Sequence, residues 1–138
     1  MKTSRKVQGD IYRLLRESDL AATITGGIYR EGMRPRDSLK EDAVVIFTTG
    51  QNGQVQQGVV TVNIYVPDID PWSDGVSVED TQRTEELETA AQLWVDSLNG
   101  RLAGYYFDTM QTIYTEEEPQ THQHFVVIRL RYRFGENN

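Results

Sequence analysis

The strongest constraint on the fold is a strict alternation of residue types close to the C-terminus. Between residues 126 and 134 every second residue is apolar: Val126, Ile128, Leu130, Tyr132 and Phe134. The positions between them hold Val127, Arg129, Arg131 and Arg133. Because successive side chains of a strand point to opposite sides, this pattern predicts a long strand at about 122–134 with one side buried.

Three more strands are predicted to complete a sheet. The β-branched run at 43–49 favours a buried strand. The pair Asn52-Gly53 tolerates the positive φ of a tight turn, so a strand at about 54–66 is expected to return beside the first. A strand at about 104–115 is joined to the last one by the turn 116–120. The four strands therefore form two hairpins.

Two helices are predicted from apolar residues at helical spacing, at about 7–19 and about 80–98. Their apolar stripes are Val7, Ile11, Leu14 and Leu15 in the first helix, and Leu87, Ala90, Ala91, Trp94, Val95 and Leu98 in the second. The order helix, hairpin, helix, hairpin indicates an α+β fold: an antiparallel sheet of about four long strands with two helices packed on one face. Residues 1–138 are expected to form a single domain, with a long, partly ordered connection at about 20–42.

The residue inventory argues against an enzyme. The absence of cysteine excludes disulfides, thiolate metal ligands and a cysteine nucleophile. Phosphate-binding glycine loops and a serine elbow are also missing, and the two histidines are near neighbours. No apolar run approaches the ~18 residues of a membrane span, and the basic N-terminus is not followed by a signal-peptide core. We expect no cofactor, no membrane contact, and folding in the cytosol.

Charge is distributed unevenly along the chain. The net charge is −7, which argues against broad binding of phosphates. Residues 1–40 hold nine Lys and Arg against five Asp and Glu, whereas residues 41–138 hold five against sixteen. This asymmetry suits a solvated surface. It equally suits a basic end that docks on the acidic face of another copy or of a partner.

Two clusters are candidate metal sites. His122 and His124 lie two residues apart, so on a strand they would share one side near the acidic run 116–118. The spacing of Asp68, Asp70, Asp74 and Glu79 is similar to that of a calcium loop. The histidine cluster has no defined third ligand. In the acidic loop, Pro71 and Trp72 interrupt the candidate ligands, and the turn glycine that a calcium loop requires is missing. We therefore favour exposed histidines and a turn held by Asx hydrogen bonds, with no metal.

The remaining candidates are surface contacts. Arg129, Arg131 and Arg133 form a basic stripe, which we interpret as a solvated sheet face with cross-strand carboxylate partners. The alternative is contact with an acidic neighbouring subunit. Trp72 lies in an acidic loop, where we expect it to fold back onto the sheet; the alternative is that it anchors a partner.

The whole pattern resembles the phage and prophage tail-terminator family of tail-completion and head-tail joining proteins. A short helix leads into an irregular segment that contains Gly32-Met33-Arg34-Pro35, and a buried strand at 43–49 follows. A strand ending Val62-Asn63-Ile64-Tyr65-Val66-Pro67 precedes a long helix and a terminal hairpin. The resemblance covers nearly the whole chain.

The resemblance implies a structural protein of the virion neck or tail, assembled in the host cytoplasm. It implies a homo-oligomeric ring, often a hexamer, that ends the tail tube, contacts connector proteins, and lets DNA pass without specific binding. We expect the acidic residues to face the lumen or tube: Glu116, Glu117, Glu118, Asp68, Asp70 and Asp74. We expect the arm at 24–40 and the last strand to contact a neighbour, through Arg30, Arg34, Arg36, Arg129, Arg131 and Arg133.

Three other functions compete with this interpretation. The first is a small-ligand or metal-binding module that uses the region of His122 and His124. The second is a nucleic-acid binder that uses the arginine stripe and the basic N-terminus, with steeply salt-dependent affinity. The third is a head-side connector or completion protein, which would share the size and the assembly logic of a tail terminator.

Overall fold

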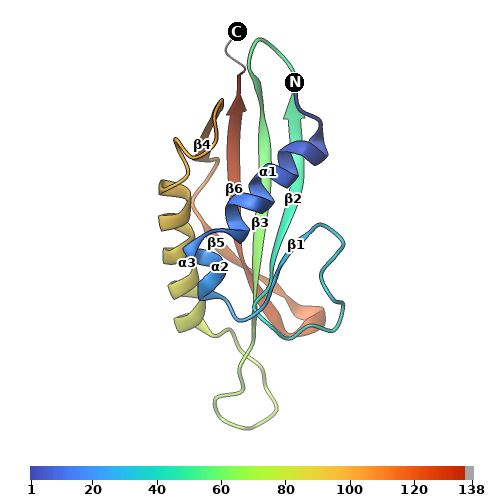
Figure 1. Ribbon diagram of the computed structural model, residues 1–138. Coiled ribbons are helices and arrows are strands. Elements are labelled where there is room, and N and C mark those ends of the chain that lie inside the picture. The colour runs from blue at the N-terminus through green and yellow to red at the C-terminus, as the bar shows by residue number, and fades with distance from the viewer. Residues whose placement is uncertain (136–138) are drawn as a thin grey trace.

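The computed structural model describes residues 1–135, which form a mixed α+β fold (Figure 1). These residues contain three α-helices, six strands and a short 3-10 helix, η1. In chain order the elements are α1 (Ser4–Arg16), α2 (Asp19–Thr23), β1 (Ile28–Arg30), β2 (Ala43–Gln51), β3 (Gln56–Pro67), α3 (Thr81–Asp96), β4 (Tyr105–Thr109), β5 (Tyr114–Glu118), η1 (Pro119–Thr121) and β6 (Gln123–Phe134).

The strands form one sheet in the order β1-β2-β3-β6-β4, with β5 also paired to β6. Strand β1 runs parallel to β2, and the other pairs are antiparallel. The two central strands, β3 and β6, pair over their full length from Gln56↔Phe134 to Pro67↔Gln123. The alternation predicted for the last strand is confirmed, because its apolar side chains and those of Val60, Val62 and Ile64 lie in the core.

The helices cover one side of this sheet. Helix α1 packs on β1 and β2, whereas α3 packs on β6, β4, β5 and β3. Thr3 caps α1, and the helix buries Val7, Ile11 and Leu15 completely. The apolar stripe predicted for the second long helix is also confirmed: Leu87, Ala91, Trp94, Val95 and Leu98 belong to the core, and Ala90 packs against it. None of the helices in residues 1–135 is long and apolar enough to cross a membrane.

The predicted strand at 104–115 is wrong as a single element. It is two short strands, β4 and β5, which pair with opposite ends of β6. Met110 donates its backbone N–H to Arg129 at 2.8 Å, and the chain then leaves the ladder and buries Ile113 in the core. The reversal expected at 116–120 comes later, because Glu116–Glu118 lie within β5 and His122 adopts a φ of 55°.

The connection at 20–42 is more ordered than the sequence predicted. It contains α2 and the parallel strand β1, which raise the element count above two helices and four strands. The chain passes close to β2 at Gly26, where a Cβ atom would lie 2.0 Å from Oδ1 of Asp42. Polar tethers hold it there, since Gly27 donates its backbone N–H to Asp42 and Thr25 donates to Glu41. Local hydrophobic periodicity does not reveal such long-range bonds.

Candidate interaction surfaces

The second part of the expected arm, residues 31–40, folds over the side of the sheet that carries no helix. From here on, the arm means residues 31–40. Arg34 fixes it there: its Nε lies 2.9 Å from Oδ2 of Asp42, and its Nη2 lies 3.0 Å from Oε1 of Gln123. The guanidinium also lies 4.0 Å from the ring centroid of Tyr65. Burial opposes ionisation of Asp42, but hydrogen bonds from Ser38, Gly27 and Arg34 outweigh it and lower the pKa of this carboxyl. Arg34, expected at a subunit contact, is therefore engaged within its own chain.

A second ion pair joins the end of the connection at 20–42 to α3. Arg83 donates from Nε and Nη2 to the two carboxylate oxygens of Glu41, at 2.6 and 2.7 Å. Its Nη2 also donates to the carbonyl of Thr23 at 2.7 Å. The hydrogen bonds with Glu41 raise the pKa of Arg83, so the guanidinium stays charged. Arg83 thus connects α2, α3 and β2, which is a structural role.

The acidic loop after β3 is held by its own carboxylates. Asp70 accepts the backbone N–H groups of Asp74 and Gly75 at 3.1 and 3.0 Å, and Asp74 accepts that of Val76 at 3.0 Å. These are the Asx hydrogen bonds that we favoured over a calcium site. Within residues 1–135 no group of three or more His, Asp and Glu side chains is arranged to hold a metal ion.

The two histidines do not form a pair on one strand side. His122 lies between η1 and β6 with a φ of 55°, and its side chain is exposed. His124 is half-buried, with Nδ1 2.6 Å from Oδ1 of Asp68 and Nε2 3.6 Å from Oε1 of Glu79. The prediction that both histidines face one side is wrong. Asp68, expected to face the lumen, contacts His124 instead.

Trp72 does not fold back onto the sheet, so that expectation is also wrong. Its side chain is 72% exposed in a loop that projects beyond one end of the sheet (Figure 1). The Asx bonds and the backbone pairing of Ile69 with Val78 hold the loop away from the strands. The ring is therefore available to a partner.

The arginine stripe lies on the side of the sheet without helices. Arg131 donates from Nε and Nη2 to both carboxylate oxygens of Asp108 on β4, at 2.8 and 2.6 Å. This pair confirms the expected cross-strand carboxylate for Arg131, and the hydrogen bond from Arg131 lowers the pKa of Asp108. Arg133 is exposed, whereas Arg129 is half-buried and contacts Tyr114 at 3.5 Å.

The acidic run expected at the lumen lies on the edge strand β5. Glu116 and Glu117 are exposed there, and Glu118 is half-exposed. Tyr114 donates its hydroxyl to Glu116 at 2.7 Å. Charged side chains on an edge strand discourage indiscriminate pairing with other strands, so this run has a local role as well.

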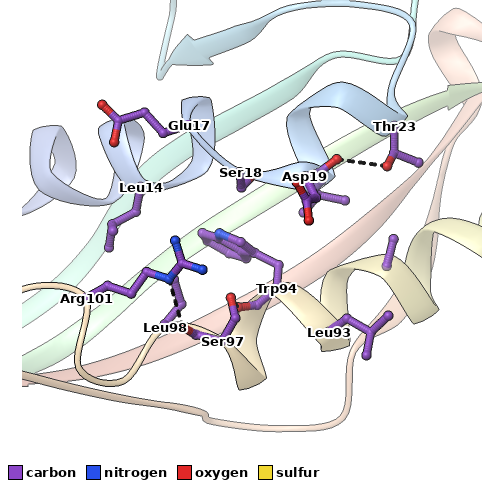
Figure 2. Close-up of a pocket in the computed structure, with 12 residues that line it drawn as sticks. Leu14, Glu17, Ser18, Asp19, Thr23, Leu93, Trp94, Ser97, Leu98 and Arg101 are labelled. Carbon is purple, nitrogen blue, oxygen red and sulfur yellow. Dashed lines mark hydrogen bonds between the residues drawn. The ribbon is translucent and has the colours of Figure 1, made fainter.

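Two hollows on the helix layer were not found from the sequence, because each needs elements that are distant in the chain. A groove of about 270 Å³ separates α1 and α2 from α3, and Figure 2 shows Leu14, Trp94 and Arg101 around it. The buried Nε1 of Trp94 has no hydrogen-bond partner within residues 1–135. The second hollow, of about 280 Å³, lies on α1 and is lined by Thr3, Arg5, Lys6, Gly9, Arg13 and Arg30. The run of cations in 5–16 was the available signal for it.

Comparison with known proteins shows similarity to solved structures. No protein-family model and no curated protein sequence matches the chain. The chain is similar to a chain in the virion of a native gene transfer agent particle, with 15% identity over 94% of both chains and a TM-score of 0.58. It is also similar to a solved protein of unspecified role, with 19% identity over 96% of this chain and 97% of the other and a TM-score of 0.52. The fold is shared.

Proposed function

We propose that this chain is a structural protein of a phage or phage-like virion. It forms a ring that terminates the tail tube and joins it to the head. The supporting observation is the end-to-end similarity of fold to a chain of a gene transfer agent virion, with 94% of both chains covered. A fold does not by itself determine function, so the surfaces must support the same conclusion.

The surfaces of the protein support assembly with other proteins better than they support catalysis. The candidate polar clusters are used internally, as in the pairs Arg34–Asp42, Arg83–Glu41 and His124–Asp68. The features that remain outward are a projecting loop with an exposed Trp72 and a helix layer with hollows. A projecting aromatic and exposed apolar positions are typical of protein contacts. We propose no catalytic role and no cofactor.

The proposed partners are further copies of the chain, the tail tube and the connector proteins. Glu116, Glu117, Asp70 and Asp74 remain our candidates for the lumen or the tube, because they are exposed. A net charge of −7 suits a channel that DNA crosses without adhering, since like charges repel. The proposed location is the neck or tail of the particle.

Deletion of the gene in the organism that encodes the chain tests this function. Without a terminator nothing stops growth of the tube, so electron microscopy should show tails of irregular length that are separated from filled heads. A plasmid copy should restore complete particles. Tails of normal length beside detached heads would instead favour the head-side connector. Complete particles from the deletion strain would contradict both roles.

A further inference from the structure

The outward side of α1 carries only cations until the helix ends. The helix contains Arg5, Lys6, Arg13 and Arg16 against the single carboxylate of Asp10. Asp10 points inward, where it accepts hydrogen bonds from Lys2 at 2.5 Å and from the hydroxyl of Tyr105 at 2.7 Å, and it also pairs with Arg13. The acidic neighbours Glu17 and Glu31 lie beyond the helix. The exposed charge of α1 is therefore positive along its whole length.

Strand β1 adds a fifth cation to this side. Arg30 crosses the helix at Gly9, where a Cβ atom would lie 2.6 Å from its Nη2. The guanidinium lies 5.4 Å from the ring centroid of Tyr12 and lines the 280 Å³ hollow together with Arg5, Lys6 and Arg13. We call the set Arg5, Lys6, Arg13, Arg16 and Arg30 the basic surface.

Helix α3 has the opposite charge. It contains four carboxylates and a single cation, Arg83, whose guanidinium is bound to Glu41 and also pairs with Glu86 at 3.0 Å. Of the carboxylates, Glu85, Glu86 and Asp96 are exposed. Leu93 lies between them on the outward side and is 66% exposed. We call Glu85, Glu86, Leu93 and Asp96 the acidic surface.

The two surfaces lie on the same side of the sheet but toward opposite ends of the strand order. Helix α1 packs on β1 and β2, and α3 packs mainly on β6, β4 and β5, at the other end of the strand order (Figure 1). Within residues 1–135, no ion pair joins a cation of the basic surface to a carboxylate of the acidic surface. They are opposite in charge, since the basic surface holds five cations and the acidic surface holds three carboxylates.

The charges on the two helices also match in spacing. Arg5 and Arg16 are separated by the same number of residues as Glu85 and Asp96, about three helical turns or ~16 Å, so each pair lies on one side of its helix. A contact between different surfaces of identical chains is heterologous, and such contacts close into rings. We propose that the basic surface of one copy docks on the acidic surface of the next copy around the ring. This inference rests on the proposed function.

Charge reversal tests the contact without disturbing the fold. The basic-side variant is Arg5→Glu/Lys6→Glu; acidic residues in the first turn favour a helix, and Glu at position 6 forms a capping box with Thr3. The acidic-side variant is Glu85→Lys/Asp96→Lys, which adds a cation to the last turn of α3. The control Arg36→Glu/Lys40→Glu makes the same charge change on exposed residues of the arm.

Light scattering across a concentration series reads out the association. We expect each variant alone to associate at least ~10-fold more weakly than the wild type, because like charges then meet across the contact. A 1:1 mixture of the two variants should recover the wild-type mass at low salt, since alternating copies restore opposite charges. Association of the wild type and of the mixture should weaken as salt rises. The control should associate as the wild type does.

Four results would overturn the contact. The first is a mixture that associates no better than either variant alone. The second is an equal loss in the arm control, which would show that the loss is not specific to the basic and acidic surfaces. The third is unchanged association with lost affinity for duplex DNA, which would make the basic surface a nucleic-acid site. Rings that form equally well from every variant would reject this contact and leave the proposed function standing.

Discussion

Asp10 connects the charge of the first helix to the core of the protein. Burial opposes its ionisation, yet hydrogen bonds from Lys2 and Tyr105 and the charges of Lys2 and Arg13 lower the pKa of the carboxyl below its ordinary value. A group with a depressed folded-state pKa adds stability above its unfolded pKa, near 3.9, and loses it as pH falls through the folded value. Asp10 therefore stabilises the fold at neutral pH.

We predict that Asp10→Asn lowers the free energy of unfolding by about 2 kcal/mol at pH 7, because the buried donors lose their charged acceptor. The difference between wild type and variant should shrink as pH falls below about 4, where the wild-type carboxylate also takes up its proton. Urea titrations at several pH values measure this. Asp37→Asn, at an exposed site, is the control. A difference that does not depend on pH would show that the charge of Asp10 is unimportant.

Truncation of the two tryptophans should change the free energy of unfolding by very different amounts. Trp94 is 5% exposed in the core, so Trp94→Ala is expected to lower the free energy of unfolding by about 3–5 kcal/mol. Trp72 is 72% exposed, so Trp72→Ala should change it by less than about 0.5 kcal/mol. Denaturant unfolding of both variants measures the contrast. A large loss for Trp72→Ala would mean that the loop packs on the protein after all.

Residue burial followed from the sequence where a periodic pattern existed. The interior positions of β6 and of both long helices were predicted correctly, because alternation and helical spacing report directly which side is buried. The intrachain partners of Arg34 and Asp68 were not predicted, because a bond such as that of Asp68 to His124 joins residues that are distant in the chain. A charged residue in a loop has no local sign of whether it is paired.

At the scale of elements, the arm is the segment that most departs from expectation. It is held by polar bonds to buried groups rather than by its own apolar residues, since Met33 and Leu39 are 68% and 71% exposed. Asp42 is 1% exposed, so loss of Arg34 would leave a buried carboxylate without its cation.

We predict that Arg34→Ala releases the arm and lowers the free energy of unfolding by about 3 kcal/mol. Trypsin should then cleave after Arg36 and Lys40 faster than in the wild type, under conditions in which the rest of the chain stays intact. Met33→Ala, which changes an exposed side chain of the same arm, should leave the cleavage rate unchanged. Equal cleavage rates in the wild type and Arg34→Ala would show that other bonds hold the arm.

The elements that could be predicted were those with many residues of one pattern. The split of β4 from β5 could not be predicted, because Ile113 between them is buried in a core that residues distant in the chain build. Strand β1 has three residues, and it is a strand only because β2 lies beside it. Short elements of this kind are set by tertiary contacts and carry little signal of their own.

At the scale of the whole molecule, charge and topology act together. The sequence showed a basic beginning and an acidic remainder, and the fold separates the basic α1 from the acidic α3 at opposite ends of the strand order. For the candidate site, the charge imbalance could be predicted from the sequence. The residues that face a neighbour could not. Of the arginines expected at a neighbour, the proposed contact retains Arg30.

The mass of the purified protein in solution, measured by light scattering at low salt with negative-stain images of the same sample, tests whether the chain closes into a ring. We predict closed rings with a defined multiple of the 15.8 kDa chain mass, which stops increasing as concentration rises. For the hexamer that mass is six times that of one chain. A single-chain mass at every concentration, with no rings in the images, would contradict a chain that closes into a ring through its own surfaces.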